Sequence, residues 1–318
     1  NTLGSSTVDT YFAYSNKTTN ADGQLLSNII VGGDQDFRVA SMSNATDGNG
    51  PQGLINLNNI NPQQKKINKS MSLGLCCQWL SPKTKRDGTV IYENAIDEKS
   101  MQLGRFKSGA YSEEYIRNVY RHNVDETIKI IPTIAANNIK CFRLTSNLFS
   151  LWEFNNHIPK EDTILQAKLK YAGELFLKNN IRVTCHPGQF TVLSSDDDNI
   201  VAKSIMELDY HAWIFDQMNL PQTPFYAINV HGGKSDRINR LTQSINSLPQ
   251  NIRNRLTLEN DETAYNVIDL LMVHKETGVP IVFDSHHHVF NDGDLTMEDA
   301  FAATAETWTK VKPLQHLS

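Results

Sequence analysis

The sequence predicts an α/β protein of the TIM (β/α) barrel class, and three observations support this prediction. From residue 72 onward, seven short apolar stretches of strand type alternate with longer stretches of helical periodicity. The connections between them have the lengths that parallel βαβ units require. His, Glu or Asp residues lie at or just after the ends of five successive strands, which is where barrel enzymes carry their functional groups.

Short runs of Val, Ile, Leu, Cys and Phe predict strands at 72–77, 141–144, 181–185, 225–230, 255–258, 280–283 and 311–314. Apolar residues three or four apart predict helices at 113–138, 163–178, 202–218, 235–248, 266–274 and 297–308. A complete barrel needs eight strands, and the chain stops at Ser318, directly after the seventh. The eighth strand comes either from the N-terminal segment or from residues absent from this sequence. We expect the second, a barrel truncated after its seventh strand.

Residues 1–68 differ in composition from the rest of the chain. They are rich in Asn, Ser, Thr and Gly, and they carry turn signals such as Asp22-Gly23 and Gly32-Gly33. This composition predicts an N-terminal appendage unrelated to the barrel, either β-rich or poorly ordered, and no motif in it indicates a role. We therefore expect two parts, the appendage at 1–68 and a barrel domain at 69–318 that is incomplete at its carboxyl end.

Composition narrows the class of protein. Hydrophobic residues make up 39% of the chain and charged residues 20%, which is typical of a soluble globular protein. No apolar run reaches the length of a membrane span, and no basic stretch followed by an apolar core begins the chain, so we expect neither a membrane protein nor a secreted one. The cysteines Cys76, Cys77, Cys141 and Cys185 lie in or beside strand-like runs, and we expect inert reduced thiols in a reducing compartment.

The residues at the strand ends are of the types that bind divalent metals. Imidazole nitrogen and carboxylate oxygen together suit ions that activate water. Every strand of a parallel barrel delivers its last residue to the same rim, so ligands far apart in sequence meet there. The candidate ligands are His186, His231, Glu259, Asp284, His287 and His316. One such histidine alone would be interpreted as a hydrogen-bonded core or loop residue, but recurrence at five strand ends favours a metal site.

The run that follows the strand at 280–283 holds two of these candidates. Asp284 and His287 are three residues apart, and we expect a tight loop that returns both side chains to one ion. We expect His286 and His288 to point elsewhere and to orient the ligands or contact a substrate. The net charge of −5 counts against general electrostatic binding of nucleic acid, although bound cations would offset the carboxylates of such a site.

Several motifs resemble the UV damage endonuclease (UvdE) family in order and spacing. They are HPGQFTVL (186–193), ELDYH (207–211), LEND (258–261) and FDSHHH (283–288), with LGLCC (73–77) and RLTSNLF (143–149) fitting the earlier strands. The resemblance runs from about residue 71 to 318 and does not cover residues 1–68.

This resemblance implies a TIM barrel related to apurinic endonucleases and sugar isomerases. It implies a DNA repair enzyme that holds two or three divalent ions, Mn²⁺ in the first place with Zn²⁺ or Mg²⁺ as alternatives. Water activated by these ions would cut double-stranded DNA on the 5′ side of UV photoproducts. The six candidate ligands carry over, and Glu259, His231 and Asp284 become the catalytic residues. Such an enzyme is expected in the cytoplasm on the nucleoid, or in a eukaryotic nucleus, as a monomer with no protein partner.

The resemblance also implies residues that contact DNA. Gln189 and Phe190 would insert into the duplex opposite the lesion, because a ring stacks where a base is displaced and an amide reaches base edges. Arg143, Lys234 and Arg237 lie near strand ends, where they would hold phosphates unless they are merely solvated surface residues. His288 is a further candidate for contact with DNA.

The chain departs from the family pattern in two places. The family carries a Lys two residues before the seventh-strand His, but here that position is Leu314, and Lys312 lies two residues earlier. The family also continues to a further His and a final-strand Glu that complete the metal cluster. Two other hypotheses therefore remain open: a metal-dependent sugar isomerase that acts on a small polyol, and a remnant that binds damaged DNA without cutting it.

Overall fold

Seven parallel strands form the sheet in the order in which they occur in the chain. The computed structural model describes residues 9–11, 72–188, 190–309 and 311–316. The strands are β2 (Gly74–Cys76), β5 (Cys141–Leu144), β6 (Arg182–Cys185), β7 (Ile228–Val230), β8 (Leu256–Glu259), β9 (Ile281–Asp284) and β10 (Leu314–His316), and each pairs with the next in parallel. The strand pattern predicted for a TIM barrel is confirmed.

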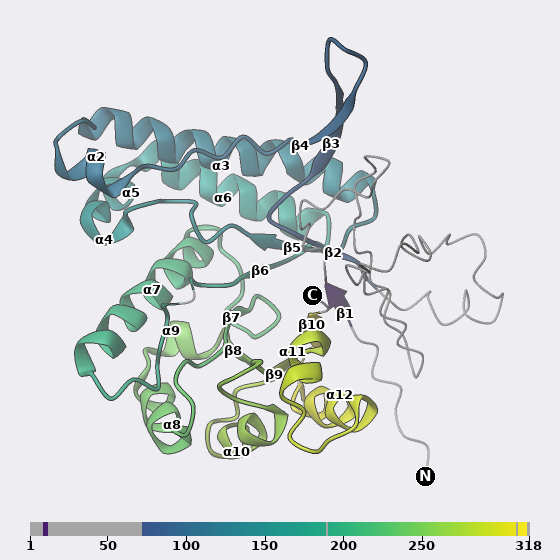
Figure 1. Ribbon diagram of the computed structural model, residues 1–318. Helices are drawn as coiled ribbons and strands as arrows, with labels where there is room; N and C mark the ends of the chain where they lie inside the picture. Colours follow the sequence, from purple (N-terminus) through teal and green to yellow (C-terminus); the bar gives the residue numbers. More distant parts are fainter. Residues whose placement is uncertain (1–8, 12–71, 189, 310, 317–318) are drawn as a thin grey trace.

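An eighth strand comes from the N-terminal segment. β1 (Asp9–Tyr11) pairs in parallel with β10, and it also contacts β2 at the other edge of the sheet. Figure 1 shows β1 between these two strands. Two sources were considered for an eighth strand. The strand that lies beside β10 comes from the N-terminal segment. The rest of the segment expected at 1–68, and Gln189, lie outside the described residues.

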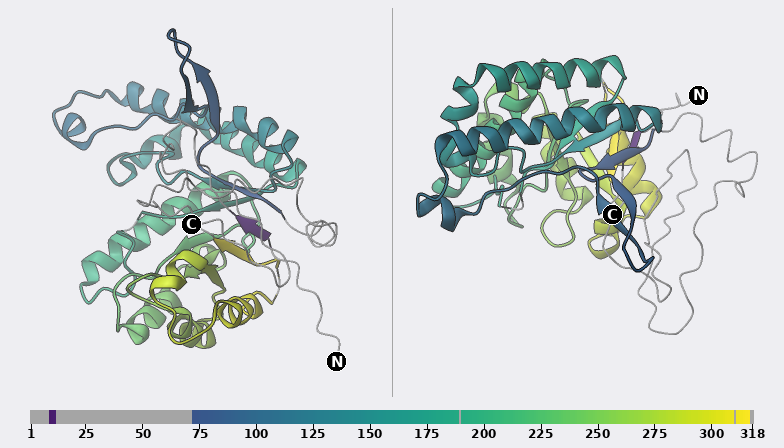
Figure 2. Two further views of the ribbon diagram at one scale, coloured as in Figure 1. Left: turned by 45° about the vertical axis from the view of Figure 1, so that its right-hand side comes forward. Right: turned by 90° about the horizontal axis from the view of Figure 1, so that it is seen from above.

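Six helices follow the strands and cover the outside of the curled sheet (Figures 1 and 2). They are α3 (Glu113–Ala136), α6 (Thr163–Lys178), α7 (Asp198–Gln217), α8 (Ile238–Ser247), α10 (Val267–Thr277) and α12 (Met297–Glu306). All six predicted helices are present. A side-chain cap begins most of them; Asp162, for example, accepts hydrogen bonds from the backbone of Ile164 and Leu165, which fixes where α6 starts.

Further short elements were not predicted. α2 (Leu103–Lys107), α4 (Trp152–Asn155), α5 (His157–Glu161), α9 (Gln250–Arg253) and α11 (Ser285–Phe290) lie in the connections. β3 (Leu80–Thr84) and β4 (Val90–Asn94) form an antiparallel hairpin that extends away from the sheet (Figure 2). None of the described helices is both long and apolar enough to cross a lipid bilayer.

The amino ends of the strands are held together by a buried arginine. Arg182, at the start of β6, donates to the carbonyl of Pro224 at 3.1 Å, before β7, and to those of Lys312 and Pro313 at 2.9 and 3.2 Å, before β10. Above it, the residues of β6, β7, β8 and β9 are buried throughout and form the core. Because the strands are parallel, their carboxyl ends lie together at the opposite rim, where the candidate site residues occur.

Candidate metal centre

Five of the predicted ligands lie at the carboxyl ends of consecutive strands. His186 directly follows β6 and His231 directly follows β7, while Glu259, Asp284 and His316 are the last residues of β8, β9 and β10. The register between β9 and β10 sets Asp284 opposite His316. Parallel pairing therefore converts widely separated sequence positions into one cluster.

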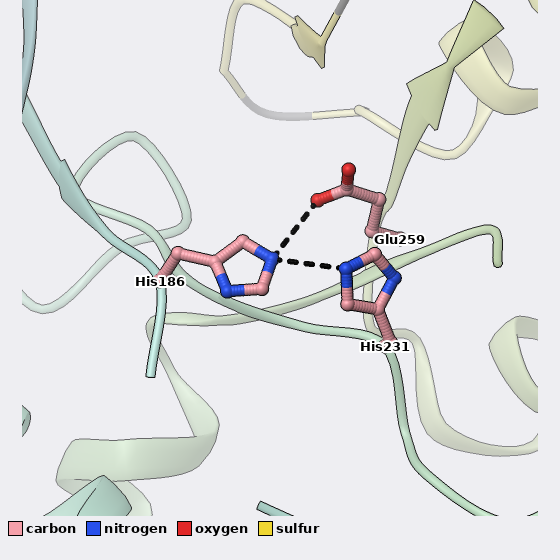
Figure 3. A group of neighbouring side chains, drawn as sticks. All are labelled: His186, His231 and Glu259. Atoms are coloured by element: carbon pink, nitrogen blue, oxygen red, sulfur yellow. Dashed lines mark hydrogen bonds and ion pairs between the residues drawn. The ribbon is translucent and has the colours of Figure 1, made fainter. Parts of the chain in front are cut away.

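The first group of potential ligands consists of His186, His231 and Glu259, shown in Figure 3. His186 Nε2 lies 3.2 Å from His231 Nε2 and 3.4 Å from Glu259 Oε2. The ligand atoms of the three residues lie within 4.8 Å of one another, which is close enough for all of them to contact one ion.

The second group consists of Glu259, Asp284 and His316, all three buried. His316 Nδ1 lies 2.8 Å from Glu259 Oε2. Glu259 belongs to both groups, so one carboxylate is shared by two sets of residues that could hold a cation. Such a shared carboxylate is suited to a centre that holds more than one ion.

The tautomer of His186 follows from its neighbour. His186 Nδ1 lies 3.0 Å from the Pro187 carbonyl, which only accepts hydrogen bonds, so Nδ1 carries the proton and Nε2 presents a lone pair to the cluster. Burial lowers the pKa of His186, and Arg143 and His231 lower it further, to about 4, although Glu259 opposes them. The ring is therefore neutral near pH 7, which is the form that binds metals.

Glu259 is held as a carboxylate despite being only 2% exposed. Burial raises its pKa, but the nearby imidazoles of His316 and His231 outweigh burial and hold the pKa well below its ordinary value. The pKa of His316 shifts the other way, because its attraction to Glu259 outweighs the effect of burial. The Asn229 amide also donates to Glu259 Oε2, and the Thr257 hydroxyl donates to Asn229 Oδ1 at 2.8 Å.

These groups fit a divalent metal ion. Lone pairs on imidazole nitrogens and carboxylate oxygens converge, and the mixed nitrogen and oxygen set suits Mn²⁺, Zn²⁺ or a similar ion. In addition, His231 Nδ1 is buried and lies 3.6 Å from Asp261 Oδ2, just beyond hydrogen-bond distance. A bound cation at His231 Nε2 would favour a proton on Nδ1 directed at Asp261, the usual partner arrangement for a ligating histidine.

His287 lies at the edge of the cluster, on a helix. We expected a tight loop after Asp284, but Asp284 is the N-cap of α11 and accepts from the backbone nitrogens of His286 and His287 at 2.8 and 3.1 Å. His287 Nε2 is 3.9 Å from Glu259 Oε1, and its Nδ1 is 3.1 Å from Glu262 Oε2. His287 thus faces the shared carboxylate from outside the two compact groups.

The predicted DNA-contacting residues have different surroundings. Phe190 is 83% exposed, directly beyond the segment that carries His186. Lys234 and Arg237 both bind Asp196, each at 2.9 Å. Arg143 lies in β5. Burial lowers the pKa of its guanidinium, but the neighbouring Cys76 and Cys77, with a smaller contribution from Glu259, raise it above its ordinary value.

His288 is only 3% exposed, with its Nε2 donating to the Leu295 carbonyl at 3.1 Å and its ring against Phe283. Its ring is therefore not accessible to DNA in this structure.

The two positions compared with the lysine of the family pattern, Leu314 and Lys312, also lie away from the cluster. Leu314 is buried, and Lys312 Nζ reaches towards Ser72 Oγ at the amino end of the sheet.

Sequence reasoning missed residues that position the cluster. Asn229 binds the Glu259 carboxylate, and Asn260 holds the end of β9 by accepting from Asp284 N at 2.7 Å and donating to Asp284 O at 2.9 Å. Glu262 binds His287. Two features of the sequence could have indicated these residues. Asn229 is a polar residue between Ile228 and Val230 in a buried strand, and an acidic run follows Glu259.

A family comparison decides the class of protein. A sequence model of the family described as UV-endonuclease UvdE matches residues 89–318, more than half of the chain. The chain belongs to the UvdE family. A UV DNA damage endonuclease of Nostoc sp. is 34% identical over 270 residues, covering 81% of this chain and 80% of the relative. One of Deinococcus radiodurans is 32% identical over 231 residues, covering 71% and 72%.

A solved structure agrees with the UvdE assignment. The crystal structure of SacUVDE matches with a TM-score of 0.64 and 28% sequence identity, over 77% of this chain and 80% of that one. As a member of the UvdE family, the chain is a DNA repair endonuclease with a TIM-barrel fold. The resemblance seen in the motifs is thereby confirmed.

Proposed function

We propose that this chain incises double-stranded DNA on the 5′ side of UV photoproducts and that the reaction depends on divalent ions held at the barrel rim. The observation that carries the proposal is Glu259, a buried carboxylate shared by two groups of potential ligands. A purely structural carboxylate at this depth would need one partner of opposite charge, whereas Glu259 Oε2 meets an imidazole nitrogen from each group, His186 Nε2 at 3.4 Å and His316 Nδ1 at 2.8 Å.

Each proposed ligand would have its own place in the centre. His186 and His231 would hold one ion with Glu259, and Asp284 and His316 would hold another on its other side. His287 would join from α11, at the edge of the centre. Two or three bound ions, Mn²⁺ in the first place, would neutralise the scissile phosphate and lower the pKa of the attacking water.

The protein's own groups prepare the centre for this chemistry. The Pro187 carbonyl fixes the His186 tautomer, and Asn229 fixes the Glu259 carboxylate, so neither ligand needs to reorganise. Arg143 adds positive charge beside the cluster, where a phosphate would lie. Glu259, His231 and Asp284 are the residues that we place closest to the reacting phosphate.

Recognition of the lesion would use residues that face the solvent. Phe190 presents its ring almost entirely to solvent, which suits stacking on a base that has lost its partner. Gln189 would act beside it. Lys234 would exchange Asp196 for a backbone phosphate, at the cost of breaking an exposed ion pair. A photoproduct stacks and pairs poorly, so the duplex deforms there more cheaply than elsewhere.

One incision experiment tests the proposal against the two alternatives, the sugar isomerase and the non-cutting remnant. Incision of a UV-irradiated duplex oligonucleotide is measured with Mn²⁺, with and without a chelator, for the unmodified chain and Glu259→Gln. We expect cutting 5′ to the lesion that the chelator abolishes, and a loss of at least about a hundredfold in rate for Glu259→Gln. Normal cutting by that variant would overturn the proposal, and binding without cutting by the unmodified chain would support the remnant.

A matched variant controls for loss of a buried carboxylate. Glu126 on α3 is also largely buried, and it binds Lys129 rather than the cluster. Glu126→Gln should leave the rate of incision within about twofold of the unmodified chain, because its carboxylate lies outside the proposed centre.

A further inference from the structure

Two thiols outside the ligand groups lie side by side at the end of β2. Cys76 is the last residue of the strand, and Cys77 follows it. Cys76 opposes Arg143 in the register of β2 and β5, and Cys77 N donates to the Arg143 carbonyl at 3.0 Å. Since parallel strands share one carboxyl rim, the pair lies on the rim that carries the candidate metal centre.

The two thiols differ from the other cysteines in exposure. We expected all four cysteines to be inert core residues, and Cys141 and Cys185 are indeed buried. Cys76 and Cys77 are intermediate in exposure, so they are less enclosed than the other two cysteines. Access is the first requirement for a reactive cysteine.

The backbone brings the two sulfurs together. Successive side chains of an extended strand point to opposite faces, so adjacent cysteines ordinarily stay apart. Cys77, however, has a φ of 58°, in the left-handed region, and Gln78 N donates to the Cys76 carbonyl at 2.7 Å across it. This tight turn around Cys77 interrupts the alternation of the strand, so the Cys77 side chain is no longer held on the face opposite Cys76. Non-glycine residues held in this region concentrate at functional positions.

The pKa values of the two thiols shift in opposite directions, which gives the two sulfurs different roles. The hydrogen bond from Cys77 lowers the pKa of Cys76 to about 6; burial opposes this shift and Arg143 assists it. The same hydrogen bond, with burial, raises the pKa of Cys77 well above its ordinary value. Cys76 is thus the thiolate, which is the nucleophilic form, and Cys77 is a protonated thiol in contact with it.

We propose that Cys76 and Cys77 form a redox-active dithiol at the barrel rim, in which Cys76 reacts with a peroxide and Cys77 then closes a disulfide with it. In the first step the Cys76 sulfur attacks one peroxide oxygen, the O–O bond breaks, and a sulfenic acid and one water are formed. In the second step the Cys77 sulfur attacks the Cys76 sulfur, and the hydroxyl leaves with the Cys77 proton as a second water. Two thiols and one hydrogen peroxide thereby give one disulfide and two waters.

The disulfide formed in this way is expected to be easily reduced. The α-carbons of adjacent residues are about 3.8 Å apart across a trans peptide bond. Ordinary disulfides join α-carbons roughly 4.4 to 6.8 Å apart. The bond would therefore be strained, and strained disulfides are the labile ones that thiols reverse. The dithiol is in this sense a reversible modification site.

Mass spectrometry of the full chain tests the proposal directly. The protein is treated with hydrogen peroxide, alkylated and digested, and the tryptic peptide 70–83 is weighed before and after dithiothreitol. We expect this peptide to lose two hydrogen masses and to regain them on reduction, while the peptides that carry Cys141 and Cys185 stay reduced. If peptide 70–83 keeps both thiols, or if the buried cysteines oxidise equally fast, the proposal is overturned.

Two variants test the separate roles. Cys77→Ser should stop at the sulfenic acid, which dimedone traps on Cys76, whereas Cys76→Ser should lower the peroxide reactivity of the peptide at least ~tenfold. Equal reactivity of the two variants would contradict the assigned roles. The measurement on the unmodified chain does not depend on whether either variant folds.

Discussion

His316 Nδ1 lies 2.8 Å from Glu259 Oε2, so an ion pair joins two of the proposed ligands. A proton on His316 and a cation on the same ring nitrogen are mutually exclusive. Binding of a metal would therefore replace an internal charge pair, and the affinity of the proposed centre would then depend on pH.

The affinity for Mn²⁺ should rise with pH. Burial lowers the pKa of His316 but Glu259 raises it above the ordinary 6.5, so the proton must be displaced at any pH below that raised value. His186, with a pKa of about 4, is already neutral and adds no such dependence near pH 7. We expect about a tenfold gain in affinity per pH unit while His316 is protonated, and a plateau above its pKa.

Calorimetric titration of Mn²⁺ between about pH 6 and pH 8 measures this dependence. His316→Gln should bind more weakly and lose most of the slope. His274→Gln, a change on α10 of a histidine that binds the Val279 carbonyl, should keep both affinity and slope. The same slope in His316→Gln as in the unmodified chain would exclude His316 as the source of the proton.

Asn229→Ala should weaken metal binding although Asn229 is not itself a ligand. Its amide holds the Glu259 carboxylate and is fixed in turn by Thr257, so its loss frees Glu259 to rotate. We expect a loss of about 10- to 100-fold in Mn²⁺ affinity and a cost of roughly 1 to 3 kcal/mol in the free energy of unfolding.

Asn123→Ala is the matched control for that change. Asn123 is equally buried, but its amide donates to the backbone carbonyls of Lys99 and Leu148, both at 2.9 Å. It should lose a similar free energy of unfolding and keep its affinity for Mn²⁺. Equal metal affinities in the two variants would show that Asn229 acts on stability alone.

Phe190→Ala should reduce incision of damaged DNA without destabilising the protein. The ring is 83% exposed, so its removal gives up little buried surface, whereas one base–aromatic stack is worth roughly 1 to 3 kcal/mol. We expect the rate of incision to fall about 10- to 100-fold. Tyr171→Ala removes an exposed ring from α6 and should have no effect. Unchanged incision by Phe190→Ala would remove Phe190 from the recognition surface.

Arg182→Ala should destabilise the barrel and leave metal affinity intact. Its guanidinium binds backbone carbonyls before β7 and β10 and lies over the Phe225 and Trp308 rings at 4.6 and 5.3 Å, all at the amino end of the sheet. We expect a loss on the order of 3 kcal/mol in the free energy of unfolding in urea. Arg240 forms an ion pair with the exposed Asp198. Its loss in Arg240→Ala should lower the free energy of unfolding by less than about 1 kcal/mol.

Much of the fold was predictable because apolar runs and caps coincide with real element ends. The strand at Cys141–Leu144 and the helix at Thr163–Lys178 have the predicted bounds. The last strand was placed too early, at 311–314, because the apolar count ignored Pro313, which has no N–H to donate to a ladder. The strand begins only after it, at Leu314.

Other elements carry no periodic signal. The β3–β4 hairpin is exposed on both faces, so its sequence lacks the alternation that burial imposes. α11 is six residues long and polar, and Asp284 both ends β9 and caps the helix, which hid its start. β1 is a short strand in a segment of turn-rich composition, and only its pairing with β10 reveals it.

The candidate site was likewise predictable only in part. Strand ends determine where His186, His231, Glu259, Asp284 and His316 lie, so parallel topology alone brings them together. The burial of His288 depends instead on how α11 packs against Phe283, and the ion pairs of Lys234 and Arg237 depend on Asp196 in a distant loop. Contacts between loops follow from tertiary packing, which no local pattern encodes.

Anomalous diffraction at the manganese edge, from crystals grown with Mn²⁺, would locate any ions bound at the barrel rim. We expect one peak bounded by His186, His231 and Glu259 and another bounded by Glu259, Asp284 and His316. Diffraction from Glu259→Gln crystals should show both peaks weakened, because the shared carboxylate is lost. Peaks at other residues, or none at the rim, would contradict a metal centre built on Glu259.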